Sequence, residues 1–203
     1  QGPRFDLHSG SFGGLVTNPV QVLSKMLAQL KNEDGTVAIP NFYDDVLELD
    51  PRERQEMAAL PVDEVALKKY LGIDELVGEP DRSIVERKTA RPTLDVNGTW
   101  GGFAGEGAKT IIPARAGAKV SMRLVPDQRA AQTNELFKDF VNSLAPPGVK
   151  IQISELHGSD PVLVERDQPA IQAAARAIEF GFGKYPLFIR EGGSIPIVGL
   201  FQE

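Results

Sequence analysis

The stretch A-K-V-S-M-R-L, residues 118–124, alternates apolar and polar side chains along its whole length. A period of two predicts a strand with one face buried and the other in solvent. The stretch V-K-I-Q-I-S, residues 149–154, has the same alternation and predicts a second half-buried strand. Each strand therefore needs other elements to cover its apolar side.

Three segments with helical periodicity can provide that cover. Residues 18–31 follow Asn18 as the expected N-cap and Pro19 as the first helical residue, and residues 132–144 end before Pro146. Residues 168–180 follow Asp167 as the expected N-cap. The sequence thus predicts an α+β fold, an antiparallel sheet with helices packed on one face. The side chains expected to face inward are Leu23, Met26, Leu27, Leu30, Leu136, Phe137, Phe140, Val141, Leu144, Ile171, Ala174, Ala175 and Ile178.

Residues 36–91 have a different character and are interpreted as an insertion. Short helical pieces are expected after Asp50-Pro51 and after Asp63, and prolines and Gly72 interrupt the segment. Proline and charged residues become frequent again at residues 160–167, which predicts a domain boundary near residue 160.

Composition excludes several classes of function. With 41% hydrophobic and 25% charged residues in 203, the chain is typical of a soluble globular protein. It has no cysteine, no apolar run long enough for a membrane span and no signal-peptide pattern at its start, which favours the cytoplasm. Acidic residues outnumber basic ones by 28 to 22, so neither nucleic acid nor an anionic membrane is an expected partner. A small molecule or another protein is favoured.

Local motifs for catalysis are weak. The glycine-rich residues 101–110 resemble a phosphate-binding loop, but Ala108 separates Gly107 from Lys109, and a strand-like Ile-Ile-Pro follows instead of a helix. The two histidines, His8 and His157, do not form a zinc-binding pattern, and no serine-centred nucleophile motif is present. The pair Asp44-Asp45 is better explained as solvated charge than as a cation site. No metal site is therefore expected within this chain.

Several dispersed phrases carry more information together than singly. They are D-L-H-S-G at 6–10 with F-G-G at 12–14 and N-P at 18–19, G-A-K-T-I-I-P at 107–113, R-L-V-P at 123–126, and R-E-G-G-S-I-P at 190–196. In this order they resemble the carnosinase-like branch of the dinuclear-zinc dipeptidase, aminoacylase and carboxypeptidase family.

The resemblance implies an architecture. Family members have an α/β catalytic domain interrupted by a lid, a four-stranded antiparallel sheet with two helices on one face, through which two subunits pair. Residues 1–160 would be this lid and dimerisation domain, entered within its first strand near Arg4 and carrying the insertion at about 36–91. Residues 161–203 would be part of the catalytic domain. The two zinc ions of each active site would be held by other parts of the parent enzyme, and none is expected on this chain.

The resemblance also implies roles for individual residues. His8 matches a lid histidine that reaches into the partner's active site and stabilises the developing oxyanion, and Thr110 matches a hydroxyl that contacts the substrate carboxylate across the dimer. Arg123 matches the arginine that binds that carboxylate. Each has a plainer alternative: a loop histidine capping local backbone, a structural strand threonine and a solvated strand arginine.

The remaining candidates are Gly193, Ser194 and His157. The first two belong to a Gly-Gly-Ser turn that lines the family's substrate pocket, after a β-like stretch at 187–190. His157 matches a pocket histidine, and it could equally cap the end of a strand. The parent would hydrolyse dipeptides or similar short amides as a homodimer. The alternatives are a non-catalytic family member that acts only in dimerisation or binding, and an unrelated helix-on-sheet domain.

Overall fold

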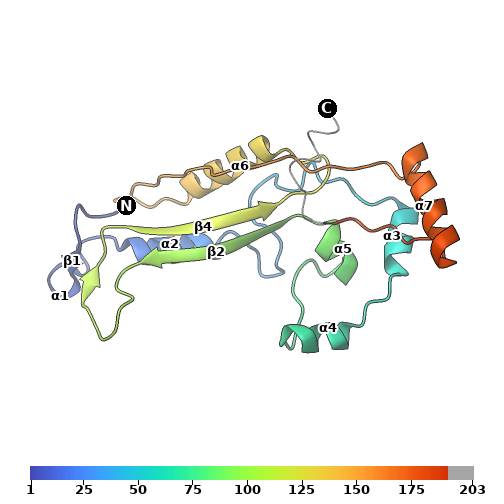
Figure 1. Cartoon of the computed structure of the whole chain (residues 1–203). Coiled ribbons are helices and arrows are strands. Elements are labelled where there is room, and N and C mark those ends of the chain that lie inside the picture. Colours follow the sequence, from blue (N-terminus) through green and yellow to red (C-terminus); the bar gives the residue numbers. More distant parts are fainter. Residues whose placement is uncertain (192–203) are drawn as a thin grey trace. The chain divides into compact units, whose positions relative to one another are not determined.

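The computed structural model describes residues 1–191, and the chain forms two compact units (Figure 1). Unit 1 comprises Gln1–Asp44, Thr93–Arg123 and Ala130–Gly158. Unit 2 comprises Asp45–Pro92, Leu124–Arg129 and the chain from Ser159 onward.

Two antiparallel strand pairs form the sheet structure of unit 1. Strand β2, Thr93–Gly101, pairs with β4, Ala116–Arg123, and an irregularity between Val96 and Gly98 shifts their register. The short strand β1, Leu7–His8, pairs with β3, Ile111–Ile112. The strand predicted at 118–124 is confirmed, although it begins two residues earlier and ends one residue earlier. The described residues thus form two sheets of two strands each, and they do not show the expected four-stranded sheet.

Two expected strands are not formed within residues 1–191, which accounts for this difference: the first strand expected near Arg4 and the strand expected at 149–154. The side chains of the segment 149–154 do alternate, with Val149, Ile151 and Ile153 half-buried and the residues between them exposed, but the segment belongs to no sheet. A ladder requires successive pairings along a neighbouring strand. The backbone pairing recorded for this segment is the exchange between Lys150 and Gln1, whose two N–H to C=O distances are both 2.7 Å.

Two helices cover one side of the β2–β4 pair. They are α2, Pro19–Ala28, where Asn18 Oδ1 caps the Val20 N–H at 3.0 Å, and α6, Ala130–Ser143. Side chains of α2 and α6 meet those of the strands in one apolar cluster, which is why the two helices share a face. The cluster is built on Leu30, Val37, Ile39, Phe42 and Leu94, and packed against it are Leu27, Tyr43, Val120, Met122, Leu136, Phe137, Phe140 and Val141.

Unit 2 contains four helices among its described residues: α3, Pro51–Ala58; α4, Glu64–Leu71; α5, Ile84–Thr89; and α7, Pro169–Phe182. The helical pieces predicted after Asp50 and Asp63 are confirmed, and both aspartates cap their helices. No helix within residues 1–191 combines the length and the hydrophobicity that a membrane span needs.

Three expectations near α7 and beyond it are wrong. The N-cap is Gln168 instead of Asp167, and its side chain makes no capping bond. Ala175 is buried as predicted, but Ala174 and Ile178 are exposed, since a helical stripe identifies an apolar side without supplying an element to cover it. Residues 187–190 form no strand.

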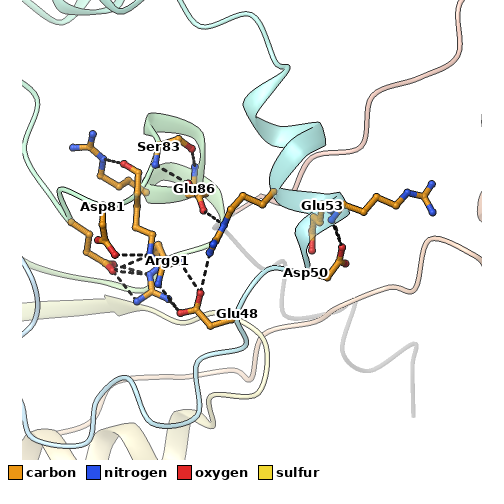
Figure 2. A network of polar contacts seen from close by, with 12 residues as sticks. Glu48, Asp50, Glu53, Asp81, Ser83, Glu86 and Arg91 are labelled. Carbon is orange, nitrogen blue, oxygen red and sulfur yellow. Dashed lines mark hydrogen bonds and ion pairs between the residues drawn. The ribbon is translucent and has the colours of Figure 1, made fainter.

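A network of ion pairs holds the insertion together (Figure 2). Glu48 accepts two hydrogen bonds from Arg82, at 2.7 and 2.8 Å, and one each from Arg54 and Arg91 at 3.2 Å. Arg91 also donates from Nε to both oxygens of Glu79 at 2.9 Å. The network therefore joins the start, middle and end of residues 48–91.

The most deeply buried carboxylate of this network is Glu86, in the capping box of α5. Its side chain accepts from the Ser83 N–H at 2.7 Å and from Arg54 Nε at 3.0 Å. Burial by itself would raise the pKa of Glu86, but the hydrogen bonds from Ser83 and the Arg54 charge outweigh it and lower the pKa. Glu86 is therefore buried as an ion with its partners in place.

Candidate functional site

The pairing of β1 with β3 brings two predicted site residues together. His8 lies opposite Ile111, and the Ser9 N–H donates to the Thr110 carbonyl at 3.0 Å. This places His8 Nε2 3.0 Å from Thr110 Oγ1, although the two residues are 102 positions apart in sequence. Both side chains are exposed, so the pair can be reached by a ligand or another subunit.

The second ring nitrogen of His8 has a local partner. Gly10 N–H donates to His8 Nδ1 at 3.0 Å, and His8 is thereby the N-cap of α1, a short helix at Ser9–Phe12. The plainer alternative for His8, a histidine that caps local backbone, is therefore the role of its Nδ1 atom. Nε2 faces Thr110 instead, so capping and a role in binding are compatible.

Asp6 fixes the segment that carries His8, and sequence reasoning gave it no role. Its Oδ1 accepts from the Ala114 N–H at 2.8 Å, just after β3. The signal that could have found it was its place in the same D-L-H-S-G phrase as His8. A carboxylate next to the paired strands stabilises the β1–β3 contact, because a hydrogen bond to a charged acceptor is stronger than a neutral one.

Arg123 ends β4, where it pairs with Thr93. Its side chain is exposed on the polar side of the strand, as the alternation predicted. No ion pair to its guanidinium is present within residues 1–191. Its donors are therefore available to an anionic group from outside the described chain.

His157 lies exposed beside the first turn of α6. The neighbouring Gly158 contacts that turn, since a Cβ on it would lie 3.4 Å from Ala130 Cβ, an ordinary contact distance. Figure 1 shows this turn of α6 at the same end of unit 1 as the C-terminal end of β4, where Arg123 lies. Gly193 and Ser194 lie outside the described residues.

The candidates therefore fall into two groups at opposite ends of unit 1. β1 and β3 lie at the N-terminal end of β4, and Arg123 at its C-terminal end (Figure 1). A strand of this length places its first and last Cα atoms about 24 Å apart. The structure brings His8 to Thr110 and does not bring Arg123 to either of them.

The described residues do not fit a metal centre. Within residues 1–191 there is no group of three or more His, Asp or Glu side chains placed to hold an ion.

Known proteins with similar sequences include two dipeptidases. The Cys-Gly metallodipeptidase dug1 of Schizosaccharomyces pombe is 33% identical over all of this chain, which spans 43% of that protein. The human Beta-Ala-His dipeptidase is 32% identical over 98% of this chain and 40% of its own length. The chain thus spans less than half the length of these relatives.

A solved structure with the same fold is the M20 family metallo-carboxypeptidase Sso-CP2 of Sulfolobus solfataricus. It has a TM-score of 0.85 and 34% identity, over 98% of this chain and 45% of that one. The family model of the peptidase dimerisation domain matches residues 6–149, which include His8, Thr110 and Arg123. With well over half of its length matched, this chain belongs to the M20 peptidase dimerisation domain family.

Proposed function

We propose that this chain is the dimer-forming lid, with an adjoining part of the catalytic domain, of a zinc-dependent dipeptidase. It would supply dimerisation and substrate contacts to a cytoplasmic hydrolase that cleaves dipeptides or short amides. Family membership and similarity to metallodipeptidases over less than half of their length support this role. The two zinc ions of each site would be held by other parts of the parent, because the described residues offer no fitting donor set.

The observation that carries the proposal is the separation of His8 and Thr110 from Arg123. A dipeptide is at most about 7 Å long, whereas β4 separates the two groups by about 24 Å. Side chains of histidine and arginine do not close this difference. One substrate can therefore meet both groups only if they come from two copies of the chain.

A two-fold dimer provides this combination naturally. Each active site would take Arg123 and His157 from one subunit, and His8 and Thr110 from the partner. Ser194 and Gly193 would line the same pocket. The outer edge of β2 has no partner strand within residues 1–191. An open groove of 690 Å³ is lined in part by residues of α2, of the end of β2 and of the segment before β4, among them Val20, Leu23 and the exposed Trp100. An unpaired strand edge is suited to pairing with a second copy.

The chemistry of each group fits its place. The Arg123 guanidinium can hold a terminal carboxylate through two parallel hydrogen bonds. An imidazole N–H aimed at the scissile carbonyl stabilises charge that develops in the transition state, and loss of one such donor typically slows turnover about 10²- to 10³-fold. Zinc would activate the attacking water when bound.

We further propose that a four-stranded sheet forms in the parent, with residues 149–154 as one outer strand. Gln1 bonds to Lys150 on one side, and the Gly2 N–H donates to the Ala114 carbonyl at 3.0 Å on the other. The N-terminal residues thus lie between the segment 149–154 and the chain leading into β4. A strand formed by these residues would pair with the segment 149–154 on one side and with the chain leading into β4 on the other.

Subunit complementation in the parent tests the proposal. His8→Ala and Arg123→Ala should each be inactive alone, since every site then lacks one group. After subunit exchange, half the dimers are heterodimers with one intact site, so activity should recover to about a quarter of wild type. Mixed isotope labels monitored by native mass spectrometry establish the exchange. No recovery despite exchange would refute the two-subunit site.

The alternative is a non-catalytic family member that acts only in dimerisation or binding. It predicts dimers that take up no zinc and hydrolyse no dipeptide, even in the full-length parent. Zinc content and hydrolysis measured on that protein distinguish the two functions directly.

A further inference from the structure

The His8 ring is held at both of its nitrogens, and this determines where its proton lies. Gly10 N–H donates to Nδ1 at 3.0 Å, and a backbone N–H cannot accept, so Nδ1 must carry the lone pair. In the neutral ring the proton is then on Nε2, and Nε2 donates to Thr110 Oγ1 at 3.0 Å.

Gly10 has a second, independent effect on the same ring. A Cβ at this position would lie 2.9 Å from His8 Cε1 and 3.1 Å from His8 Nδ1, closer than side chains tolerate without a shift. Any residue larger than glycine must therefore displace the imidazole or the start of α1.

From these contacts we propose that Gly10 and Thr110 are positioning residues for His8. They hold its imidazole in one orientation with the proton on Nε2, ready to donate to a carboxylate or carbonyl oxygen of a bound ligand. The inference deepens the proposed function and rests on it for the identity of the ligand. The geometry of the ring, however, can be tested without catalysis.

The proton position decides what His8 can do. With the proton on Nδ1, Nε2 could only accept and would repel an incoming oxygen. With the proton on Nε2, the ring offers a donor on the side that faces Thr110, already oriented for an oxygen that takes the place of the Thr110 hydroxyl. Thr110 Oγ1 occupies the position of the acceptor in the absence of ligand, and a ligand oxygen would take its place.

The experiment uses ¹⁵N-labelled histidine in this chain, where only His8 and His157 give imidazole signals. His157→Gln assigns the two signals. We expect His8 to carry its proton on Nε2. In Thr110→Val the exchange of that proton with water should become faster on the order of tenfold, as expected for the loss of one hydrogen bond. Thr110→Ser, which keeps the hydroxyl, should restore slow exchange.

Gly10→Ala should change the His8 ring signals by displacing the ring. Its matched control is Gly98→Ala, where an added Cβ meets nothing within 4 Å. Thr99→Val is the control for loss of an exposed threonine hydroxyl. Both controls should leave His8 unchanged, and His157 should be unchanged in all of these variants.

A proton on Nδ1 of His8 would overturn the inference. So would equal exchange rates in Thr110→Val and wild type, or control variants that change His8 as much as the test variants do. Failure of subunit complementation with these NMR results intact would refute the two-subunit site alone. Successful complementation with the wrong proton position would refute the positioning role alone.

Discussion

Replacing Glu79 by Ala should destabilise unit 2 much more than replacing Glu48 by Ala, although Glu48 contacts more arginines. Glu79 pairs with Arg91 through Nη2 at 2.8 Å and through Nε at 2.9 Å, and the two side chains are only 10% and 12% exposed. The Glu48 side chain is 54% exposed. Solvent therefore screens the Glu48 contacts much more than it screens the Arg91–Glu79 pair.

The expected magnitudes follow from this difference in burial. Removing one partner of a buried ion pair costs about 3–5 kcal/mol, because the other charge is left buried. Arg91 keeps its bond to Glu48 in the Glu79→Ala variant, so we expect the free energy of unfolding to fall by the lower value, about 3 kcal/mol. Exposed pairs contribute about 0–1 kcal/mol each, and we expect about 1 kcal/mol for Glu48→Ala.

Hydrogen exchange with mass spectrometry resolves the two units separately. A loss of about 3 kcal/mol corresponds to about 100-fold faster exchange of peptides within residues 45–92, and about 1 kcal/mol to about fivefold. Peptides from β4 in unit 1 serve as the internal reference. Glu75→Ala removes an exposed carboxylate of the same unit and should change nothing. Equal effects of Glu48→Ala and Glu79→Ala, or none from Glu79→Ala, would refute the argument from burial.

Three further outcomes are expected. Unit 2 should lose stability as the pH falls below about 4.3, the ordinary pKa of glutamate. Hydrogen bonds from Arg82 and Arg166 lower the pKa values of Glu48 and Glu56, respectively. The stability that these two carboxylates contribute is therefore present above about pH 4.3 and is lost as the pH falls through the lowered pKa values. Circular dichroism measured against pH follows this loss, and constant stability down to about pH 2 would contradict it. Sedimentation should show a dimer of this chain at high micromolar concentration, and a monomer alone would count heavily against pairing through the lid. Elemental analysis after dialysis should find no stoichiometric zinc, and about one or two tightly held ions per chain would overturn the assignment of the ligands to other parts of the parent.

The apolar core of unit 1 could be predicted because its determinants are local. Alternation in 118–124 and helical spacing around Leu27 and Phe137 each identify a buried side without any knowledge of the partner. The same local rules were wrong for Ile178, since nothing in a helical stripe states whether another element covers it. They also predicted the alternating burial of 149–154, but the strand expected there is not formed, because a strand requires successive pairings with a neighbour far along the chain.

The site shows the same division between local and long-range information. The D-L-H-S-G phrase identified His8, and a backbone-capping histidine was one interpretation of it, but the contact of His8 with Thr110 does not follow from spacing. That contact depends on two short strands pairing over more than a hundred residues. Arg123 lies at the end of β4 that is far from His8 and Thr110. This position likewise depends on the direction of β4 and could not be obtained from the order of the motifs.

The hydroxyl of Thr110 can serve both roles that the site requires of it. A hydroxyl carries one donor and two acceptor positions. Thr110 can therefore accept from His8 Nε2 and at the same time donate its own hydrogen to a carboxylate oxygen. Hydrogen bonds in such a chain strengthen one another, because a hydroxyl group that accepts one hydrogen bond is polarised and becomes a stronger donor for the next. A carboxylate that arrives at Thr110 thus meets a donor already polarised by His8, and movement of the ring toward the scissile carbonyl would weaken that donor. Substitution of Thr110 should accordingly affect both carboxylate binding and turnover, whereas a threonine that only contacted the carboxylate would affect binding alone.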